Sequence, residues 1–127
     1  MSPVRASSTR GLGAYANVFA IESFIDELAH LAGKDPMQFR REHLPDPRFQ
    51  ALIDKMDELT NWASRTPKQG WGVAFTECFT GLCGHAVKVA RGTDGKVFIE
   101  KVIGLMDCGW YVNPDTIRAQ VEGSIVM

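Results

Sequence analysis

Arg10, Gly11 and Gly13 form the stretch of this sequence whose residue types best suit binding chemistry. Glycine lets the backbone approach a ligand closely, and arginine can bind a phosphate through two parallel hydrogen bonds. Because a helix is predicted directly after them, their backbone amides would join the positive end of its dipole, which favours an anion. Taken alone, these residues favour an ordinary loop, since no strand precedes them and no third glycine completes a dinucleotide fingerprint. An anion site stays the open alternative.

The cysteines and one histidine form the other group that could bind a ligand. Cys78, Cys83 and Cys108 are odd in number, which does not suit a disulfide framework. His85 would complete a metal set with Cys78 and Cys83 only if a fourth ligand came from elsewhere. The sequence therefore predicts no metal site and favours buried thiols on strands.

The helix that positions the glycine-rich loop is predicted from apolar residues at three- and four-residue spacing. Asn17 is the expected N-cap, and Gly33 the expected left-handed residue after the last turn. His30 and His43 lie near the ends of this helix and the next, where imidazoles commonly interact with helix carbonyls, and neither is predicted to be catalytic. The stripe expected to be buried consists of Ile21, Phe24, Ile25, Leu28, Leu31 and Ala32.

Two further helix starts follow. Asp35-Pro36 and Asp46-Pro47 each place an aspartate cap before a proline in the first helical position. Gln38 has the spacing to reach back and complete a capping box. The third helix carries an apolar stripe between Phe49 and Ala63, and Trp62 near its end is the expected packing anchor.

The period then changes from helical to alternating, which predicts strands. Trp71, Val73 and Phe75 share one face of a first strand. A second strand over 85–91 and a third over 96–106 flank the turn Gly92-Thr-Asp-Gly95, so they should pair as a hairpin. One face of this sheet is expected to be exposed to solvent, because it carries the charged residues Lys88, Lys96 and Glu100.

A last helix is predicted to begin after the cap Asn113. Its apolar stripe, Ile117, Val121 and Ile125, runs to a chain end that is still apolar, so we expect the sequence to be cut there and the exposed stripe to drive self-association. The fold class is α+β, with N-terminal helices followed by an antiparallel sheet and a C-terminal helix. We expect one domain over 1–127, with helices at about 17–65, the sheet at about 70–107 and the last helix at about 114–127.

Composition excludes several classes of protein. The 127 residues are 45% hydrophobic and 23% charged, which is typical of a globular domain. A net charge of −1 provides no basic surface for nucleic acid. No apolar run approaches the ~20 residues of a membrane span, and the N-terminus lacks the apolar core of a signal peptide. We therefore expect no membrane insertion and a cytoplasmic location, with a periplasmic parent as the open alternative.

Two motifs together resemble the large, molybdenum-binding subunit of the xanthine dehydrogenase and aldehyde oxidase family. The first runs from Arg10-Gly-Leu-Gly through Asn17-Val-Phe-Ala-Ile-Glu to Gly33-Lys-Asp-Pro-Met-Gln-Phe-Arg40. The second is Asp107-Cys-Gly, Asn113-Pro-Asp and Gln120-Val-Glu-Gly123, in the expected order and spacing. The branch that it resembles most comprises bacterial enzymes that hydroxylate aldehydes or N-heterocycles such as nicotinate and isoquinoline.

The resemblance implies a cofactor site and a reaction. Arg10, Gly11 and Gly13 match residues that line the molybdopterin cofactor in the family, and Gln120 matches a glutamine that contacts it. Phosphates and a polar pterin suit arginine, backbone amides and an amide side chain. The implied parent hydroxylates an aldehyde or N-heterocycle with water as the oxygen source, uses a cofactor in dinucleotide form, and passes electrons to an iron–sulfur subunit.

The resemblance also implies what this chain does not contain. The family's catalytic glutamate belongs to a glycine-flanked motif expected beyond Met127, and its Gly-Gln-Gly motif is expected before Met1. No residue is therefore assigned a catalytic role, and the glutamates Glu22, Glu27, Glu77 and Glu122 match none of these motifs. We expect an inactive fragment of a larger subunit that binds no cofactor by itself. The alternatives are a free-standing, non-catalytic binding or assembly module and an accidental match by a generic α+β domain.

Overall fold

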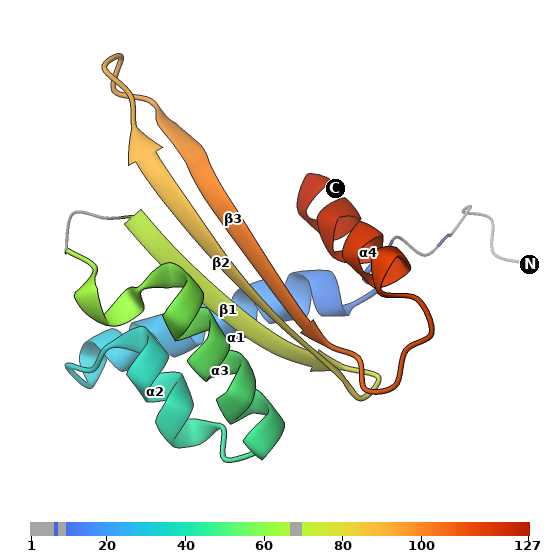
Figure 1. Ribbon diagram of the computed structural model, residues 1–127. Coiled ribbons are helices and arrows are strands. Elements are labelled where there is room, and N and C mark those ends of the chain that lie inside the picture. Colours follow the sequence, from blue (N-terminus) through green and yellow to red (C-terminus); the bar gives the residue numbers. More distant parts are fainter. Residues whose placement is uncertain (1–6, 8–9, 67–69) are drawn as a thin grey trace, which may run out of the picture.

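The structure is a computed structural model that describes residues 7, 10–66 and 70–127. Its helices precede and follow one antiparallel sheet, which confirms the α+β prediction (Figure 1). The helices are α1 (Ala14–Leu31), α2 (Pro36–His43), α3 (Pro47–Thr60), the 3-10 turn η1 (Trp62–Ser64) and α4 (Pro114–Val126). The strands are β1 (Gly70–Cys78), β2 (Gly81–Arg91) and β3 (Val97–Asp107).

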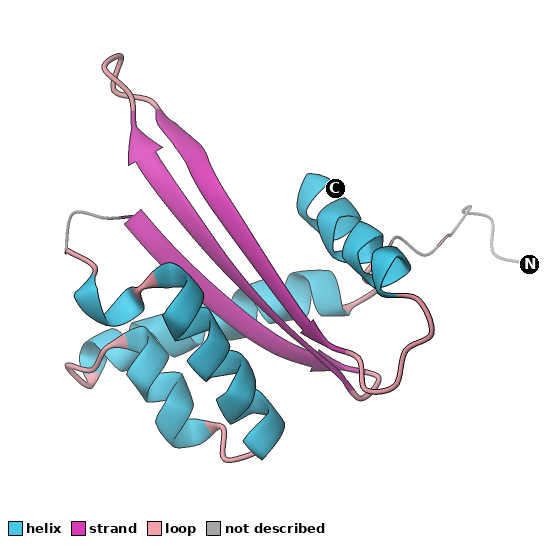
Figure 2. Ribbon diagram, in the orientation of Figure 1, coloured by secondary structure: helices cyan, strands magenta, loops and turns pink. Residues whose placement is uncertain are grey.

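The sheet has the order β1-β2-β3, and both neighbouring pairs are antiparallel (Figure 2). The predicted hairpin of β2 and β3 is confirmed, and a bulge interrupts its register between Lys88 and Val89. The second strand begins at Gly81 rather than at residue 85, because Phe79 and Thr80 alone connect it to β1. Both residues have positive φ, as a tight two-residue hairpin turn requires, although neither is a glycine. This missing glycine signal is why the sequence pattern placed the strand too late.

Helices cover the two faces of the sheet very unequally. A Cβ added to Gly84 would lie 2.8 Å from Phe75 and 3.3 Å from Leu52 of α3, so α3 packs closely on that face. Gly104 faces the other way, because it pairs with His85 and not with Gly84. A Cβ there would lie 2.6 Å from Val121 of α4, which places α4 on the opposite face near β3 (Figure 1).

The buried core lies on the α3 side. Val73 and Phe75, which were predicted to share one face of the first strand, are buried, and Trp71 is packed against the same core. The predicted anchor Trp62 is 3% exposed, and its Nε1 donates to Asp35 at 2.9 Å. The core consists of Met37, Phe49, Leu52, Ile53, Met56, Trp62, Val73, Phe75, Leu82 and Ala86. It therefore joins α2, α3 and the sheet.

The capping predictions are confirmed for the later helices. Asp35 accepts from the amides of Met37 and Gln38, and Asn113 accepts from the amide of Asp115 at 2.9 Å. The prediction that the Gln38 side chain reaches back to complete a capping box is wrong, because this side chain donates instead to Glu42 at 3.1 Å. Gly33 has φ +64, as predicted for the residue that ends the first helix.

The first helix differs most from its prediction. It begins at Ala14 instead of after Asn17, because Gly13 already has right-handed helical φ and ψ and its carbonyl accepts from the Asn17 amide at 3.2 Å. Its predicted apolar stripe is only partly covered, since Ile25 and Leu28 are half-buried and only Ala29, outside the stripe, is a buried residue of α1. Ile21, Phe24 and Leu31 are 58%, 57% and 80% exposed. The helix contacts α2 and β1 through a face that overlaps the predicted stripe only at Ile25 and Leu28.

The cysteines were expected to be buried thiols on strands. Cys78 is exposed, so this prediction is wrong for that residue, because it stands at the end of the edge strand β1. Cys83 lies on β2 and is half-buried. Cys108 is half-buried too, but it follows the end of β3, so its predicted place on a strand is wrong; all three cysteines are free.

Candidate cofactor-binding site

Arg10 joins the loop before α1 to the last helix. Its Nη2 donates to the Gln120 carbonyl oxygen at 2.6 Å and to Gln120 Oε1 at 2.9 Å. Its Nη1 lies 3.8 Å from the sulfur of Met127. Two residues of the predicted site, 110 positions apart in sequence, are thus brought into direct contact.

The loop itself has the backbone geometry that suits an anion. Gly11 and Leu12 have φ +92 and +51, and Gly13 returns to right-handed values as the N-cap of α1. Successive amides in left- and right-handed conformations form a concavity with a positive potential, and the α1 dipole adds to it. Among the described residues, no side chain caps the amino end of α1, which leaves its first amides for other acceptors.

A cavity of about 580 Å³ lies beside Arg10. Its lining comprises Arg10, Gly11, Ala14, Tyr15, Val18, Thr76, Ser124 and Met127. This volume is within the range of small-molecule sites. Of the four predicted residues, Arg10 and Gly11 line the cavity. Gln120 does not line it but contacts Arg10, and Gly13 does not line it but is the N-cap of α1.

Thr76, Tyr15 and Ser124 are site residues that the sequence did not reveal. Thr76 belongs to β1, and only the packing of α1 and α4 against the same side of the sheet brings it here. No spacing rule connects three elements so distant in sequence. The proximity of Tyr15 and Ser124 to the two motifs was the only available signal.

The donors fit a molybdopterin. The guanidinium of Arg10 and the amides at the start of α1 are donors that suit phosphate groups. The hydroxyls of Thr76 and Ser124 donate to the carbonyls of Glu77 at 3.4 Å and Val121 at 2.6 Å, so their oxygens serve as acceptors for a polar ring system. Apolar walls from Ala14 and Val18 complete the lining.

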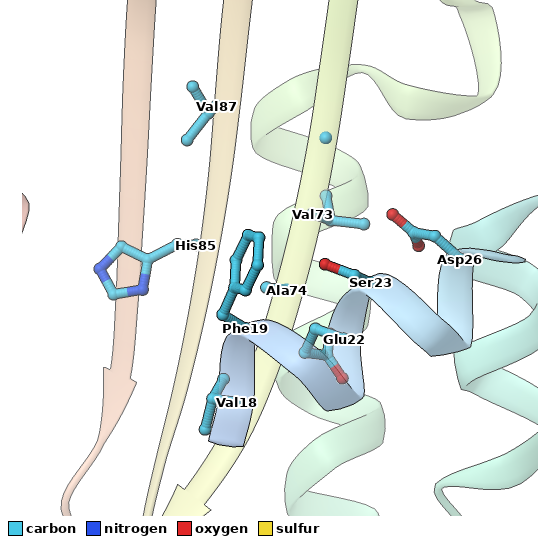
Figure 3. A pocket seen from close by; sticks show the side chains of 10 residues that line it. Val18, Phe19, Glu22, Ser23, Asp26, Val73, Ala74, His85 and Val87 are labelled. Atoms are coloured by element: carbon cyan, nitrogen blue, oxygen red, sulfur yellow. The ribbon is translucent and has the colours of Figure 1, made fainter. Parts of the chain in front are cut away.

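A second, smaller cavity of about 280 Å³ lies between α1 and the sheet (Figure 3). Phe19 projects from α1 over it, opposite His85 of β2. Burial lowers the pKa of His85, so its imidazole is neutral at pH 7. Glu22 and Asp26 also line this cavity, but both carboxylates are already paired with Arg40. The second cavity therefore offers no free acid–base group from α1.

Arg40 is the centre of a buried ion cluster. Its Nε donates to Glu22 Oε2 at 2.9 Å, its Nη1 to Asp26 at 2.6 Å, and two backbone carbonyls accept from it as well. The same Glu22 oxygen accepts from the Phe75 amide of the edge strand β1 at 2.9 Å. The arginine is 2% exposed. This cluster attaches α1 to α2 and β1, and its role is structural.

The second motif is organised around Asp107. Arg48 Nε donates to Asp107 Oδ2 at 2.8 Å, and the Gly109 amide donates to Oδ1 at 2.9 Å. These hydrogen bonds lower the pKa of Asp107 to about 2. Arg48 also donates to the Thr80 carbonyl at 3.1 Å, so it joins the β1–β2 turn to the end of β3.

Among the described residues, no three His, Cys, Asp or Glu side chains are placed to hold a metal ion. Burial, together with the neighbouring Cys78 and Cys108, raises the pKa of Cys83 and keeps it a thiol. Within the same described ranges, no helix has both the length and the apolar character needed to cross a membrane.

Comparison with known proteins shows the family. The profile of the molybdopterin cofactor-binding domain matches residues 2–127. One subunit of the nicotinate dehydrogenase of Pseudomonas putida is 38% identical over 99% of this chain, and the beta subunit of the isoquinoline 1-oxidoreductase of Brevundimonas diminuta is 30% identical over 92%. A membrane-bound aldehyde dehydrogenase of Gluconacetobacter polyoxogenes, whose name specifies pyrroloquinoline quinone, is 35% identical over 84%. No solved structure matches at a significant level.

The chain spans only 12%, 16% and 17% of the lengths of these three relatives. Two of them are named as parts of oxidoreductases with more than one subunit. The match over nearly every residue confirms the resemblance that the two motifs indicated. The chain belongs to the molybdopterin cofactor-binding domain family.

Proposed function

We propose that this chain forms one domain of a larger molybdopterin-binding subunit that hydroxylates an aldehyde or an N-heterocycle. The names of the relatives, which specify nicotinate, isoquinoline and aldehyde, support this class of substrate. Water supplies the oxygen, and electrons pass to an iron–sulfur subunit. The proposal includes a dinucleotide form of the cofactor and a cytoplasmic location for the parent.

The contact between Arg10 and Gln120 beside the 580 Å³ cavity carries this proposal. When bound, the molybdenum that molybdopterin holds would supply the redox centre of the oxidation. Arg10 binds a phosphate group of the cofactor, with the backbone amides of Gly11 and Gly13 adding positive potential. Gln120, which does not line the cavity, orients Arg10 towards the cofactor through its two oxygens. These residues bind and orient, and none of them transfers a proton.

By the same proposal, the 127-residue chain alone neither holds molybdenum nor turns over substrate. The residues assigned here line only one side of a cofactor, and none of them is catalytic. The alternative is a non-catalytic module that keeps the fold without the chemistry.

Metal analysis tests the proposal in two preparations. In the full-length parent, Arg10→Ala should lower molybdenum occupancy, because a hydrogen bond to a charged group contributes about 1.5–3 kcal/mol, or about tenfold to a hundredfold in affinity. Arg118→Ala is the matched control, since Arg118 lies on helix α4 and, among the described residues, pairs only with Asp115, at 3.8 Å and exposed. Equal occupancy in both variants would show that Arg10 does not bind the cofactor.

The isolated chain is the second preparation. We expect no molybdenum by metal analysis and no dye reduction with aldehydes or N-heterocycles. Stoichiometric molybdenum accompanied by turnover would refute the proposal that the remainder of a larger subunit is needed.

A further inference from the structure

Gly123 is an unexpected residue in the middle of the contact between Arg10 and α4. It lies inside helix α4, and glycine stabilises a helix less than every other residue except proline. Close packing against the sheet does not explain it, because the α4 side chain that lies against Gly104 of β3 is that of Val121, and the three neighbours nearest to position 123 do not come from the sheet. Some other contact must require the absence of a side chain at position 123.

The atoms around Gly123 identify that contact. A Cβ built there would lie 2.9 Å from Arg10 Nη1 and 3.8 Å from both Arg10 Cζ and Nη2, and Arg10 provides the three nearest neighbours. Residues 120 and 123 are three positions apart, so they lie on the same side of the helix. The guanidinium therefore lies against the bare backbone of Gly123 while Gln120 accepts from its Nη2.

We propose that Gly123 is a positioning residue for Arg10. The space that it leaves lets the guanidinium approach the backbone of α4 closely, and the two oxygens of Gln120 then fix its direction at the cavity. Ser124 and Met127, on the next turn, line the same cavity and continue this surface. The consequence for a phosphate-bearing ligand rests on the proposed function, but the contact between Gly123 and Arg10 does not.

Replacing Gly123 with alanine should weaken ligand binding without weakening the fold. An alanine methyl group at 123 would displace the end of a flexible side chain, which is a small cost, while helix propensity would improve. Gly123→Ala should therefore not lower the unfolding temperature of the chain. It should, however, move the guanidinium away from Gln120.

The test uses the 127-residue chain, nuclear magnetic resonance and inorganic pyrophosphate as the probe. In the unmodified chain, the Arg10 Nε–H should give a resolved signal that shifts when pyrophosphate is added. In Gly123→Ala, this signal should change position or broaden, and the dissociation constant for pyrophosphate should rise about tenfold, the value of one hydrogen bond to a charged group. An unchanged signal with unchanged affinity would overturn the proposal.

Two variants serve as controls. Ala119→Gly, at an exposed position of the same helix, lowers helix propensity without approaching Arg10, so it should destabilise α4 yet keep the Arg10 signal. In an Arg10→Lys background, Gly123→Ala should have no further effect on affinity, because lysine lacks the planar fork that needs the space. An equal loss in that background would show that Gly123 acts through the fold, and would overturn the proposal.

The two proposals fail in different ways. If pyrophosphate does not bind the unmodified chain but Gly123→Ala still moves the Arg10 signal, the positioning role stands and the proposed phosphate contact fails. If no Arg10 signal distinguishes the two chains while Arg10→Lys weakens pyrophosphate binding, the phosphate contact stands and the positioning role fails.

Discussion

Arg40 attaches α2 to α1, and Arg10 attaches the loop before α1 to α4. The region around Arg40 is built for stability, whereas the region around Arg10 is suited to binding a ligand. Arg40 is 2% exposed and donates to two carboxylates and two carbonyls, so its hydrogen bonds are directed into the protein. Arg10 is exposed, contacts one residue of α4 through hydrogen bonds to oxygen, and lies beside a cavity. A buried arginine that is fully paired holds elements together. An exposed arginine at a cavity is available for a ligand.

The two regions also lie on different supports. The Arg40 region rests on the core between α2, α3 and the sheet. In the Arg10 region, α4 has no buried residue and packs on β3 through a few side chains. Local stability should therefore be lower around Arg10, as is usual for ligand-binding segments.

The largest expected effect is the loss of the Arg40 cluster. Arg40→Met should lower the free energy of unfolding by about 3–5 kcal/mol, because it leaves the carboxylate of Glu22 without its buried partner. Urea unfolding measures this. Arg41→Met is the matched control on the same helix, and its loss should stay below about 1 kcal/mol because its partners Asp54 and Asp57 are partly exposed.

By the same measurement, Arg10→Met should lower the free energy of unfolding by no more than the Arg41→Met control does. If Arg10→Met destabilised the chain as much as Arg40→Met, the two regions would not differ in the way described, and Arg10 would be structural.

The second expected effect is on self-association, and it depends on whether α1 or α4 exposes more apolar surface. The α4 stripe is partly covered, since Ile117 and Val121 are half-buried and only Ile125, at 40%, is exposed. Ile21, Phe24 and Leu31 of α1 are far more exposed. We therefore expect the isolated chain to associate chiefly through α1, a different surface from the one that its sequence indicated.

Light scattering on two triple variants tests this. Polar replacement of Ile21, Phe24 and Leu31 should weaken association at least about tenfold, because burying even one such side chain contributes about 1.5–3 kcal/mol. Polar replacement of Ile117, Val121 and Ile125 is the comparison, and a return to monomer only in that variant would indicate pairing or swapping of α4. A monomeric unmodified chain at high concentration would refute both.

The smallest expected effect is on the pH dependence of stability at Asp107, which belongs to neither region. Hydrogen bonds from Arg48 and Gly109 lower its folded pKa to about 2 from the ordinary value of 3.8, so the stability that it contributes is present above about pH 4 and is lost as the pH falls towards 2. Asp107→Asn should lower the unfolding temperature at pH 7 but leave it nearly unchanged near pH 2. Asp94→Asn, whose lysine partner is 85% exposed, is the control, and an equal effect there would contradict this role for Asp107.

Local signals in the chain were sufficient to predict the elements that depend on a few neighbouring residues. Asp35, Asp46 and Asn113 cap helices through their own side chains, Gly33 adopts its left-handed conformation, and the turn Gly92–Gly95 closes a hairpin. The two motifs were also sufficient to indicate the family, because their order and spacing are specific when taken together. Each of these signals acts within a few residues or is read directly from the chain.

How the two motifs meet could be seen only after the helices were packed on the sheet. The contact of Arg10 with Gln120, the space left by Gly123 and the presence of Thr76 in the cavity depend on how α1 and α4 lie against that one sheet. The burial of α1 was mispredicted for the same reason, since an apolar stripe shows that a face can be buried but not that a partner lies against it. Arg40 is the clearest case, because a charged residue in a helix gives no sign of its burial until Glu22 and Asp26 of another helix are placed around it.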